Sequence, residues 1–411
     1  MSANNIQYKL SFPSQAINSS IKLVSSKSES NRALIINAVS GGKCELSNVS
    51  EARDTQTMLR LLADETVPVW DVLDAGTTMR FLSAYAAIKG INKTMTGTER
   101  MQERPIGILV DALRQLGAKI EYLKNEGFPP HKIEAHNGLN TNKISMKGDV
   151  SSQFISAILM NAPLFENGLI IALEGKIASR PYLEMTLQLM SHFGLSSHWE
   201  GNEIHVEKGQ YKTQKYQIES DWSGASYWYS VVALAENAEI ELIGLKENSL
   251  QGDSVLVQIM EPLGVKSTFN ENGVVLSKIP HQQEVKIDFS DCPDIAQTLS
   301  VIAAAKGIKL QLTGLESLRI KETDRIAAIQ NELQKLGADM PEIETDLFEV
   351  VSSNFSVNGQ LIDTYDDHRM AMAFAPLALI GNISIDNPSV VNKSYPSYWE
   401  HLKQIGIQIK E

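Results

Sequence analysis

The sequence has few of the features that mark disulfide-stabilised or metal-binding proteins. Only two cysteines are present, Cys44 and Cys292. Their wide separation argues against a disulfide framework or a thiolate metal site and favours a reducing compartment. The eight histidines show no His-x-x-x-His or similar ligand spacing, so we expect no structural metal. We therefore expect a cytoplasmic protein.

Long hydrophobic runs are absent too. The longest, Met370 to Ile380, is about half as long as a membrane span and contains Pro376, so it predicts a buried helix. Residues 1–15 are polar and lack the apolar core of a signal peptide. The net charge of -12 argues against nucleic acid or an anionic membrane as the main partner. Small anionic substrates are compatible with it, because a cationic pocket can lie within an acidic surface.

An internal repeat organises the 411 residues, which are too many for one core and predict two domains. An amphipathic helix ending in glycine recurs at spacings of 77, 70, 73 and 69 residues, at Gly117, Gly194, Gly264, Gly337 and Gly406. A degraded first copy near residues 58–70 would bring the total to about six units. Each unit also contains a helix that is apolar on all sides, which is typical of a buried position. The pattern predicts an α/β fold with mixed sheets around central buried helices.

Cations recur where these buried helices are expected to begin. A helix N-terminus already carries a partial positive charge, so a cation there is unfavourable unless an anion compensates for it. The same helix ends offer unpaired N–H groups that suit phosphate and carboxylate. The pattern therefore predicts a site for more than one anionic group. The seven cations are Lys27, Arg32, Arg104, Lys321, Arg325, Arg369 and Lys393.

The motifs that contain these cations resemble those of the enolpyruvyl transferase family, most closely the branch that acts on shikimate 3-phosphate. Nine motifs occur in the family's order between about residues 20 and 405: KSESNR, AGTTMR, ERPI, SSQF, SRPY, PDIA, KETDR, DHRMAM and the lysine before SYP. The resemblance implies an inside-out α/β barrel fold with two similar domains of three βαβαββ repeats each. One domain would cover residues 25–220, and the other residues 1–24 plus 221–411, with the active site in the cleft between them.

The resemblance also implies a reaction. The enolpyruvyl group of phosphoenolpyruvate would pass to the 5-hydroxyl of shikimate 3-phosphate by addition and elimination, releasing phosphate, in chorismate and aromatic amino acid biosynthesis. Asp294 resembles the base that deprotonates the hydroxyl, and Glu322 the acid that protonates the methylene carbon, with Lys27 as a third catalytic group. No cofactor is implied, neither metal nor nucleotide, and we expect a monomer.

Further residues resemble the family's ligands of each substrate. Those for shikimate 3-phosphate are Lys27, Ser28, Arg32, Ser151, Ser152, Gln153, Ser179, Tyr182, Asp294, Ser317 and Lys321. Those for phosphoenolpyruvate are Lys27, Gly76, Arg104, Gln153, Arg325, Arg369 and Lys393, with Thr77 and His368 as additional candidates.

Three features depart from the family pattern. Asp74 and Ser317 stand where asparagine is usual, and the stretch between Asp54 and Asp74 is short, as if the first repeat had lost a strand or two. We expect Asp74 either to cap its helix or to pair with Arg80. Two other functions fit part of the sequence. A UDP-N-acetylglucosamine enolpyruvyl transferase would need a cysteine in a mobile loop, and neither Cys44 nor Cys292 has that context. A non-catalytic protein that binds phosphorylated metabolites would not need Asp294 and Glu322.

Overall fold

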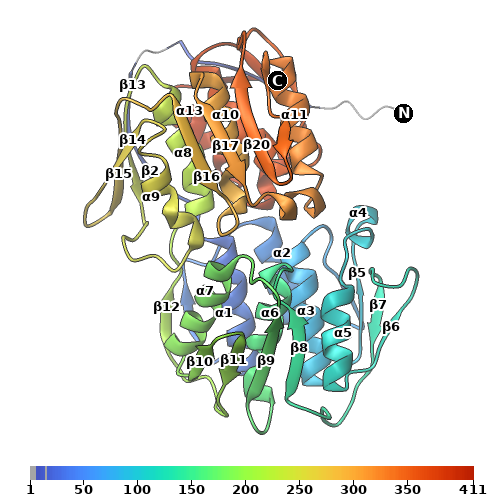
Figure 1. Cartoon of the computed structure of the whole chain (residues 1–411). Helices are drawn as coiled ribbons and strands as arrows, with labels where there is room; N and C mark the ends of the chain where they lie inside the picture. The colour runs from blue at the N-terminus through green and yellow to red at the C-terminus, as the bar shows by residue number, and fades with distance from the viewer. Residues whose placement is uncertain (1–5, 14–15) are drawn as a thin grey trace. The chain divides into compact units, whose positions relative to one another are not determined.

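The computed structural model describes residues 6–13 and 16–411, which form two compact units (Figure 1). One unit is Ser25–Ile218, and the other combines Met1–Val24 with Glu219–Glu411. Both contain helices surrounded by small sheets, so the predicted α/β class is confirmed. Throughout the described ranges, each helix is too short or too polar to cross a lipid bilayer.

The unit Ser25–Ile218 has three sheets. They have the strand orders β12-β3, β4-β5-β7-β6 and β10-β11-β9-β8. Its strands are β3 (Glu45–Ser47), β4 (Val69–Asp71), β5 (Lys93–Thr96), β6 (Ile120–Tyr122), β7 (His131–Ile133), β8 (Lys143–Lys147), β9 (Leu169–Glu174), β10 (Ser197–Glu200), β11 (Glu203–Val206) and β12 (Lys215–Gln217). Its helices are α1 (Lys27–Val39), α2 (Arg53–Ala63), α3 (Gly76–Lys89), α4 (Glu99–Gln102), α5 (Gly107–Leu116), α6 (Ser152–Leu159) and α7 (Arg180–His192).

The other unit repeats this plan with larger sheets. Their strand orders are β21-β22-β1-β23, β14-β15-β13-β2 and β16-β17-β20-β18, with β19 also paired to β20. The strands are β1 (Gln7–Ser11), β2 (Ala16–Lys22), β13 (Asn237–Ile243), β14 (Val265–Phe269), β15 (Gly273–Lys278), β16 (Glu284–Asp288), β17 (Lys309–Thr313), β18 (Ala338–Asp339), β19 (Glu342–Glu344), β20 (Leu347–Ser352), β21 (Leu361–Ile362), β22 (Ile383–Asp386) and β23 (Gln408–Lys410). The helices are α8 (Trp222–Leu234), α9 (Leu256–Ile259), α10 (Ala296–Lys306), α11 (Arg325–Lys335), α12 (His368–Phe374) and α13 (Tyr398–Gln404).

The predicted repeat is present in both units. All five repeat glycines have a positive φ, between 85° at Gly194 and 105° at Gly117 in the first unit and between 84° at Gly337 and 101° at Gly264 in the second. The left-handed conformation ends a helix and redirects the chain, and glycine adopts it without steric strain. One prediction was wrong. Before Gly264 the amphipathic helix is reduced to α9, a single turn preceded by a 3-10 turn.

The all-apolar helices occupy the interior of each unit, as predicted. Helix α3 contacts both α1 and α6 in the first unit, and α8, α10 and α12 contact one another in the second. The run from Met370 to Ile380 is buried up to Ala378 but is not one α-helix. It leaves α-helical geometry after Phe374 and continues as a 3-10 helix over Ala375–Leu379, because Pro376 lacks the N–H that an α-helix would need there.

The first repeat is shortened, as predicted. Its sheet contains only β3 and β12, whereas the other sheets of the described chain have four or more strands. A short connection follows α2 in place of further strands, and Lys93 holds it. The Lys93 ammonium donates to the carbonyl oxygens of Glu65 (2.6 Å) and Val67 (2.8 Å) and lies over the Trp70 ring.

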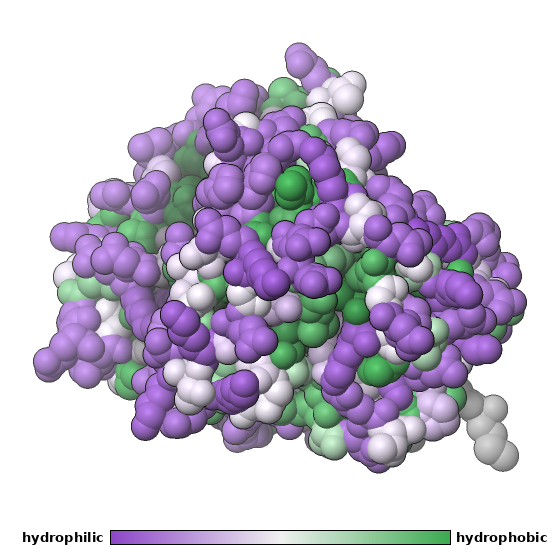
Figure 2. Space-filling view, turned by 90° about the horizontal axis from the view of Figure 1, so that it is seen from below, coloured by the Kyte–Doolittle hydropathy of each residue, from purple (hydrophilic) through white to green (hydrophobic). Residues whose placement is uncertain are grey.

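Large hydrophobic side chains are exposed at scattered positions. The face shown in Figure 2 is mostly hydrophilic, with hydrophobic residues interspersed. Some of the exposed residues lie near the shortened repeat, but most belong to other elements. They are Ile6, Val67, Val69, Leu73, Ile108, Leu123, Leu164, Ile320, Ile343 and Ile380.

Candidate active site

In the unit Ser25–Ile218, helix α1 begins at one of the predicted cations. The Ser26 hydroxyl accepts a hydrogen bond from the Glu29 amide and caps the helix, so Lys27 is its first residue. The Lys27 ammonium lies 3.3 Å from an Asp54 carboxylate oxygen, and Asp54 is buried. The repulsion between Lys27 and the helix N-terminus is thus partly offset by Asp54.

Arg32 is buried and held by groups from its own helix and α7. Its guanidinium donates to the Thr186 hydroxyl (2.7 Å) and to the carbonyl oxygens of Ser28 (2.9 Å) and Tyr182 (3.4 Å). Burial lowers the pKa of Arg32 to about 10, although the charges of Tyr182 and Glu29 oppose this shift. Arg32 therefore stays cationic at neutral pH, and its contacts orient it rigidly beside Ser28, four residues earlier on the same helix face.

Gly76, the first residue of α3, allows Arg104 to approach the backbone. A Cβ atom at Gly76 would lie 2.7 Å from one guanidinium nitrogen of Arg104, which no side chain could tolerate without movement. Arg104 is 8% exposed. Nearby in sequence, Thr77 is half-buried, and the Arg80 guanidinium donates to the side-chain amide oxygen of Gln153 at 2.8 Å.

The predicted hydroxyl ligands lie at the starts of α6 and α7. Ser151 is the N-cap of α6, and Ser152 is its first residue. Ser179 is the N-cap of α7 and has a left-handed backbone with φ of 53°. A non-glycine residue in this conformation is strained and marks sites where the backbone is held for a purpose. Tyr182, one turn later, is half-buried.

In the other unit, Arg325 binds three carboxylates. Its guanidinium lies 2.7 Å from Asp367, 2.9 Å from Glu322 and 3.1 Å from Asp294, and its side chain is 2% exposed. Lys393 is also buried and lies 3.5 Å from the second Glu322 oxygen. The attraction of the carboxylates, chiefly Asp367, outweighs burial and raises the pKa of Arg325 above its usual range.

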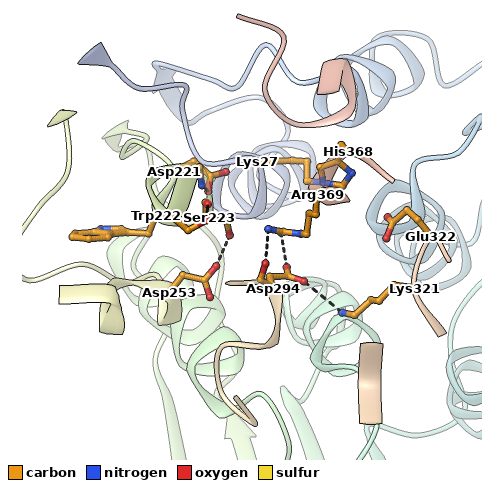
Figure 3. Close-up of polar contacts among 12 residues, drawn as sticks. Lys27, Asp221, Trp222, Ser223, Asp253, Asp294, Lys321, Glu322, His368 and Arg369 are labelled. Carbon is orange, nitrogen blue, oxygen red and sulfur yellow. Dashed lines mark hydrogen bonds and ion pairs between the residues drawn. The ribbon is translucent and has the colours of Figure 1, made fainter. Parts of the chain in front are cut away.

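Asp294 lies between cations (Figure 3). Arg369 is 2.8 Å from one carboxylate oxygen, and Arg325 and Lys321 are 3.1 Å and 3.9 Å from the other. Partial burial raises the pKa of Asp294, but the charges of Arg369, Lys321 and Arg325 together outweigh it and hold the pKa well below its usual range. Burial in turn lowers the pKa of Lys321. Asp294 is therefore ionised at neutral pH and able to accept a proton.

Only some of the seven predicted cations lie at the start of a helix. Lys27, Arg325 and Arg369 lie in the first turn of α1, α11 and α12, but Arg32 is one turn further along. Arg104 lies before α5 begins, Lys321 follows the 3-10 helix Glu316–Ile320 that contains Ser317, and Lys393 ends another 3-10 helix. Lys321 and Lys393 lie near acidic partners, Asp294 and Glu322, whereas Arg32 is held by a hydroxyl and two carbonyl oxygens.

Asp74 and His368, whose roles were left open by the sequence, lie in different surroundings. Asp74 does not cap α3, whose N-cap is Ala75, and its carboxylate lies 2.7 Å from Arg53. His368 is buried at the start of α12, with its ring 3.5 Å from Asp367. Asp367 caps this helix through the Arg369 amide (2.8 Å) while it binds Arg325.

Comparison with known proteins identifies the family of this chain. A family model described as EPSP synthase (3-phosphoshikimate 1-carboxyvinyltransferase) matches residues 12–69 and 63–402. A 3-phosphoshikimate 1-carboxyvinyltransferase from Bacteroides fragilis is 49% identical over 410 residues, covering 98% of this chain and 99% of that protein. One from Pseudoalteromonas atlantica is 36% identical over 423 residues, covering 96% and 97%. The chain belongs to the EPSP synthase family.

EPSP synthases transfer the enolpyruvyl group of phosphoenolpyruvate to shikimate 3-phosphate in aromatic amino acid biosynthesis, and this chain is an enzyme of that kind. A solved EPSP synthase from Acinetobacter baumannii has the same fold. Its TM-score is 0.78 at 22% identity, with 98% of this chain and all of that chain covered.

Two site residues were not identified from the sequence. Asp367 was visible in the Asp-His-Arg motif but had no role until the structure placed it on Arg325. Asp253 carries no motif signal. It is buried, accepts a hydrogen bond from the Ser223 hydroxyl, and faces the charges of Asp294, Arg369 and Asp221 (Figure 3). Only the fold brings it close to Asp294.

Asp253 should lower stability at neutral pH. Burial and the charge of Asp294 raise the pKa of Asp253 to about 6, and the Ser223 hydrogen bond and Arg369 offset them only in part. The folded state therefore binds more protons than the unfolded state between about pH 4 and 6, so stability falls as pH rises through this window. At pH 7, Asp253→Asn should raise the free energy of unfolding by about 1–3 kcal/mol, and at pH 4 the gain should vanish.

Urea denaturation across pH 4–8 would measure this effect. Asp339→Asn is the control, because Asp339 is an exposed carboxylate on β18 in the same unit. An equal gain at pH 4 and pH 7 would contradict the electrostatic explanation.

Proposed function

We propose that Asp294 and Glu322 carry out the two proton transfers of the reaction. The observation that supports this most directly is their shared partner, Arg325, which places two carboxylates on one buried cation. A protein that only bound phosphorylated metabolites would need the cations but not two acids among them. The pair therefore favours catalysis over binding alone.

Asp294 would remove the proton from the 5-hydroxyl of shikimate 3-phosphate. Its neighbouring cations keep Asp294 ionised, as a base must be, but the same charges weaken it as a proton acceptor until substrate anions bind them. The hydroxyl oxygen then forms a bond to C2 of phosphoenolpyruvate while Glu322 gives a proton to C3. This produces a tetrahedral intermediate that carries a methyl group.

Glu322 would then take a proton back from that methyl group as the bond from C2 to the phosphate oxygen breaks. For the first step Glu322 must be protonated, yet Arg325 and Lys393 both lie against its carboxylate. We propose that phosphoenolpyruvate resolves this conflict. Its phosphate and carboxylate would neutralise these cations, so that the protonated form of Glu322 becomes favourable once substrate binds.

The remaining residues would hold the two substrates. Arg104, Arg325, Arg369 and Lys393 suit the phosphate and carboxylate of phosphoenolpyruvate, since a guanidinium donates to two oxygens at once. Gly76, which Arg104 approaches closely, and the half-buried Thr77 would also contact phosphoenolpyruvate. For shikimate 3-phosphate we propose Ser28, Arg32, Ser151, Ser152, Gln153, Ser179, Tyr182, Ser317 and Lys321, with Lys27 serving both substrates.

This assignment divides the site into two groups of residues. Those before Ile218 belong to one compact unit, and those after Glu219 to the other. We propose that both groups act on the same pair of substrates, so neither unit would be active alone. We also propose a monomeric cytoplasmic enzyme, because one chain supplies every candidate group and both of its cysteines are buried free thiols.

The rival use of UDP-N-acetylglucosamine is disfavoured by the same cysteines. By family resemblance, an enzyme for that reaction would need a cysteine on a mobile loop. Burial raises the pKa of Cys292, and the nearby charge of Asp253 adds to it, which keeps the thiol protonated and unreactive. Burial also raises the pKa of Cys44.

Phosphate release tests the proposal. With shikimate 3-phosphate and phosphoenolpyruvate supplied together, the purified enzyme should release phosphate, and with either one alone it should not. Glu322→Gln should lower turnover by about 10²- to 10⁴-fold because glutamine cannot donate the proton. Glu316→Gln, an exposed residue in the 3-10 helix that precedes Glu322, is the control. Unchanged turnover in Glu322→Gln would reject its role, and turnover with UDP-N-acetylglucosamine would favour the rival enzyme.

A further inference from the structure

The chain is strained where it approaches Asp367 and Arg369. The turn 363–367 joins β21 to α12, and two consecutive residues in it, Tyr365 (φ of 52°) and Asp366 (φ of 54°), have left-handed backbones. Neither is glycine, so each is less stable in this conformation than in an ordinary right-handed one. Such a turn persists only where surrounding contacts hold it.

Glu332 supplies these contacts from α11. Its side chain is fully buried. One carboxylate oxygen accepts the Tyr365 hydroxyl at 2.8 Å, and the other accepts the Asp363 amide at 3.2 Å. The Lys335 ammonium lies 2.7 Å from the same carboxylate and so offsets the charge of Glu332. It also lies 2.9 Å from the Asp363 carboxylate. A buried carboxylate is therefore paired with both the backbone and a side chain of the strained turn.

The same helix holds the other end of the turn. Arg325 is seven residues before Glu332, so the two side chains lie two turns apart on one face of α11. Arg325 binds Asp367, where the turn ends and α12 begins. One rigid helix thus fixes the turn at Asp363 and Tyr365 through Glu332, and at Asp367 through Arg325.

We propose that Glu332 is a positioning residue for the phosphoenolpyruvate anion. By fixing the turn 363–367 it sets where Asp367 and Arg369 lie, although it touches no reacting atom. The inference rests on the proposed role of Arg369 as a ligand of phosphoenolpyruvate. Asp366 also accepts a hydrogen bond from Asn387 (2.8 Å), so the loss of Glu332 should displace the turn without unfolding the domain.

The test is steady-state kinetics with each substrate varied in turn. Glu332→Ala should raise the KM for phosphoenolpyruvate about tenfold, since it removes hydrogen bonds to a charged group, and should leave the KM for shikimate 3-phosphate within about twofold. Tyr365→Phe, which loses one of these bonds, should have a smaller effect in the same direction. Glu332→Gln, which can still accept the Tyr365 hydroxyl, should recover part of the loss and keeps the test valid if Glu332→Ala folds poorly.

Leu333→Ala is the matched control, because Leu333 is a buried residue on the same helix with an apolar side chain. It should lower the melting temperature without changing either KM. If the Glu332 variants behave like Leu333→Ala, the residue is only structural and the inference is wrong. Arg369→Lys, measured in parallel, tests the ligand role of Arg369 separately from the positioning role of Glu332. An unchanged KM for phosphoenolpyruvate in that variant would reject both the ligand role of Arg369 and the role of Glu332 that rests on it.

Discussion

Replacing Asp294 with asparagine should lower the rate of phosphate release by about 10²- to 10⁴-fold, the usual contribution of a general base. Asparagine has nearly the same shape but cannot accept a proton. It also removes the negative charge that Arg369, Arg325 and Lys321 surround. Because the loss occurs in the proton transfer, kcat should fall more than the KM for shikimate 3-phosphate rises.

Asp291→Asn is the matched control for Asp294. Asp291 is an exposed carboxylate three residues earlier, so its replacement should leave kcat unchanged. Equal turnover of the wild-type enzyme and Asp294→Asn, with both substrates saturating, would assign the base to another residue.

Replacing Arg325 with alanine should have the largest effect on stability. The substitution would leave Asp367, Glu322 and Asp294 without their shared cation, and the Asp367 side chain is fully buried. Removing one partner of a buried ion pair typically destabilises a protein by about 3–5 kcal/mol, because the remaining charge is left unpaired in a poorly solvated site. Urea denaturation at pH 7 would measure the loss, and phosphate release should be abolished as well.

Two comparisons test this explanation. Arg319→Ala removes an arginine that is 44% exposed and pairs with Glu342 and Asp324, so the loss should be about 1 kcal/mol or less. Adding Asp367→Asn to Arg325→Ala should restore part of the stability, because it removes a buried charge that no longer has its partner. A double variant less stable than Arg325→Ala would mean that packing, not charge, causes the loss.

Some of the fold could be predicted because it depends on local properties. A helix that is apolar on all sides has to be buried, and a glycine after a helix readily takes the left-handed conformation that ends it. Both rules hold from Gly117 to Gly406. The amphipathic pattern was a poorer guide before Gly264, where it predicts a full helix but the chain forms only the single turn α9. A few apolar residues at helical spacing do not ensure a helix when neighbouring loops can bury them equally well.

The acids, cations and hydroxyls along the chain, in the order typical of EPSP synthases, were enough to indicate the chemistry of this protein. Packing determines which of these groups meet. Asp253 faces Asp294, Arg104 packs on Gly76, and Glu332 holds the turn before Arg369. The physical reason is the range of the interactions. Helix capping and periodicity act over a few residues, whereas a buried ion pair joins side chains far apart in the chain that only packing brings within a few ångströms.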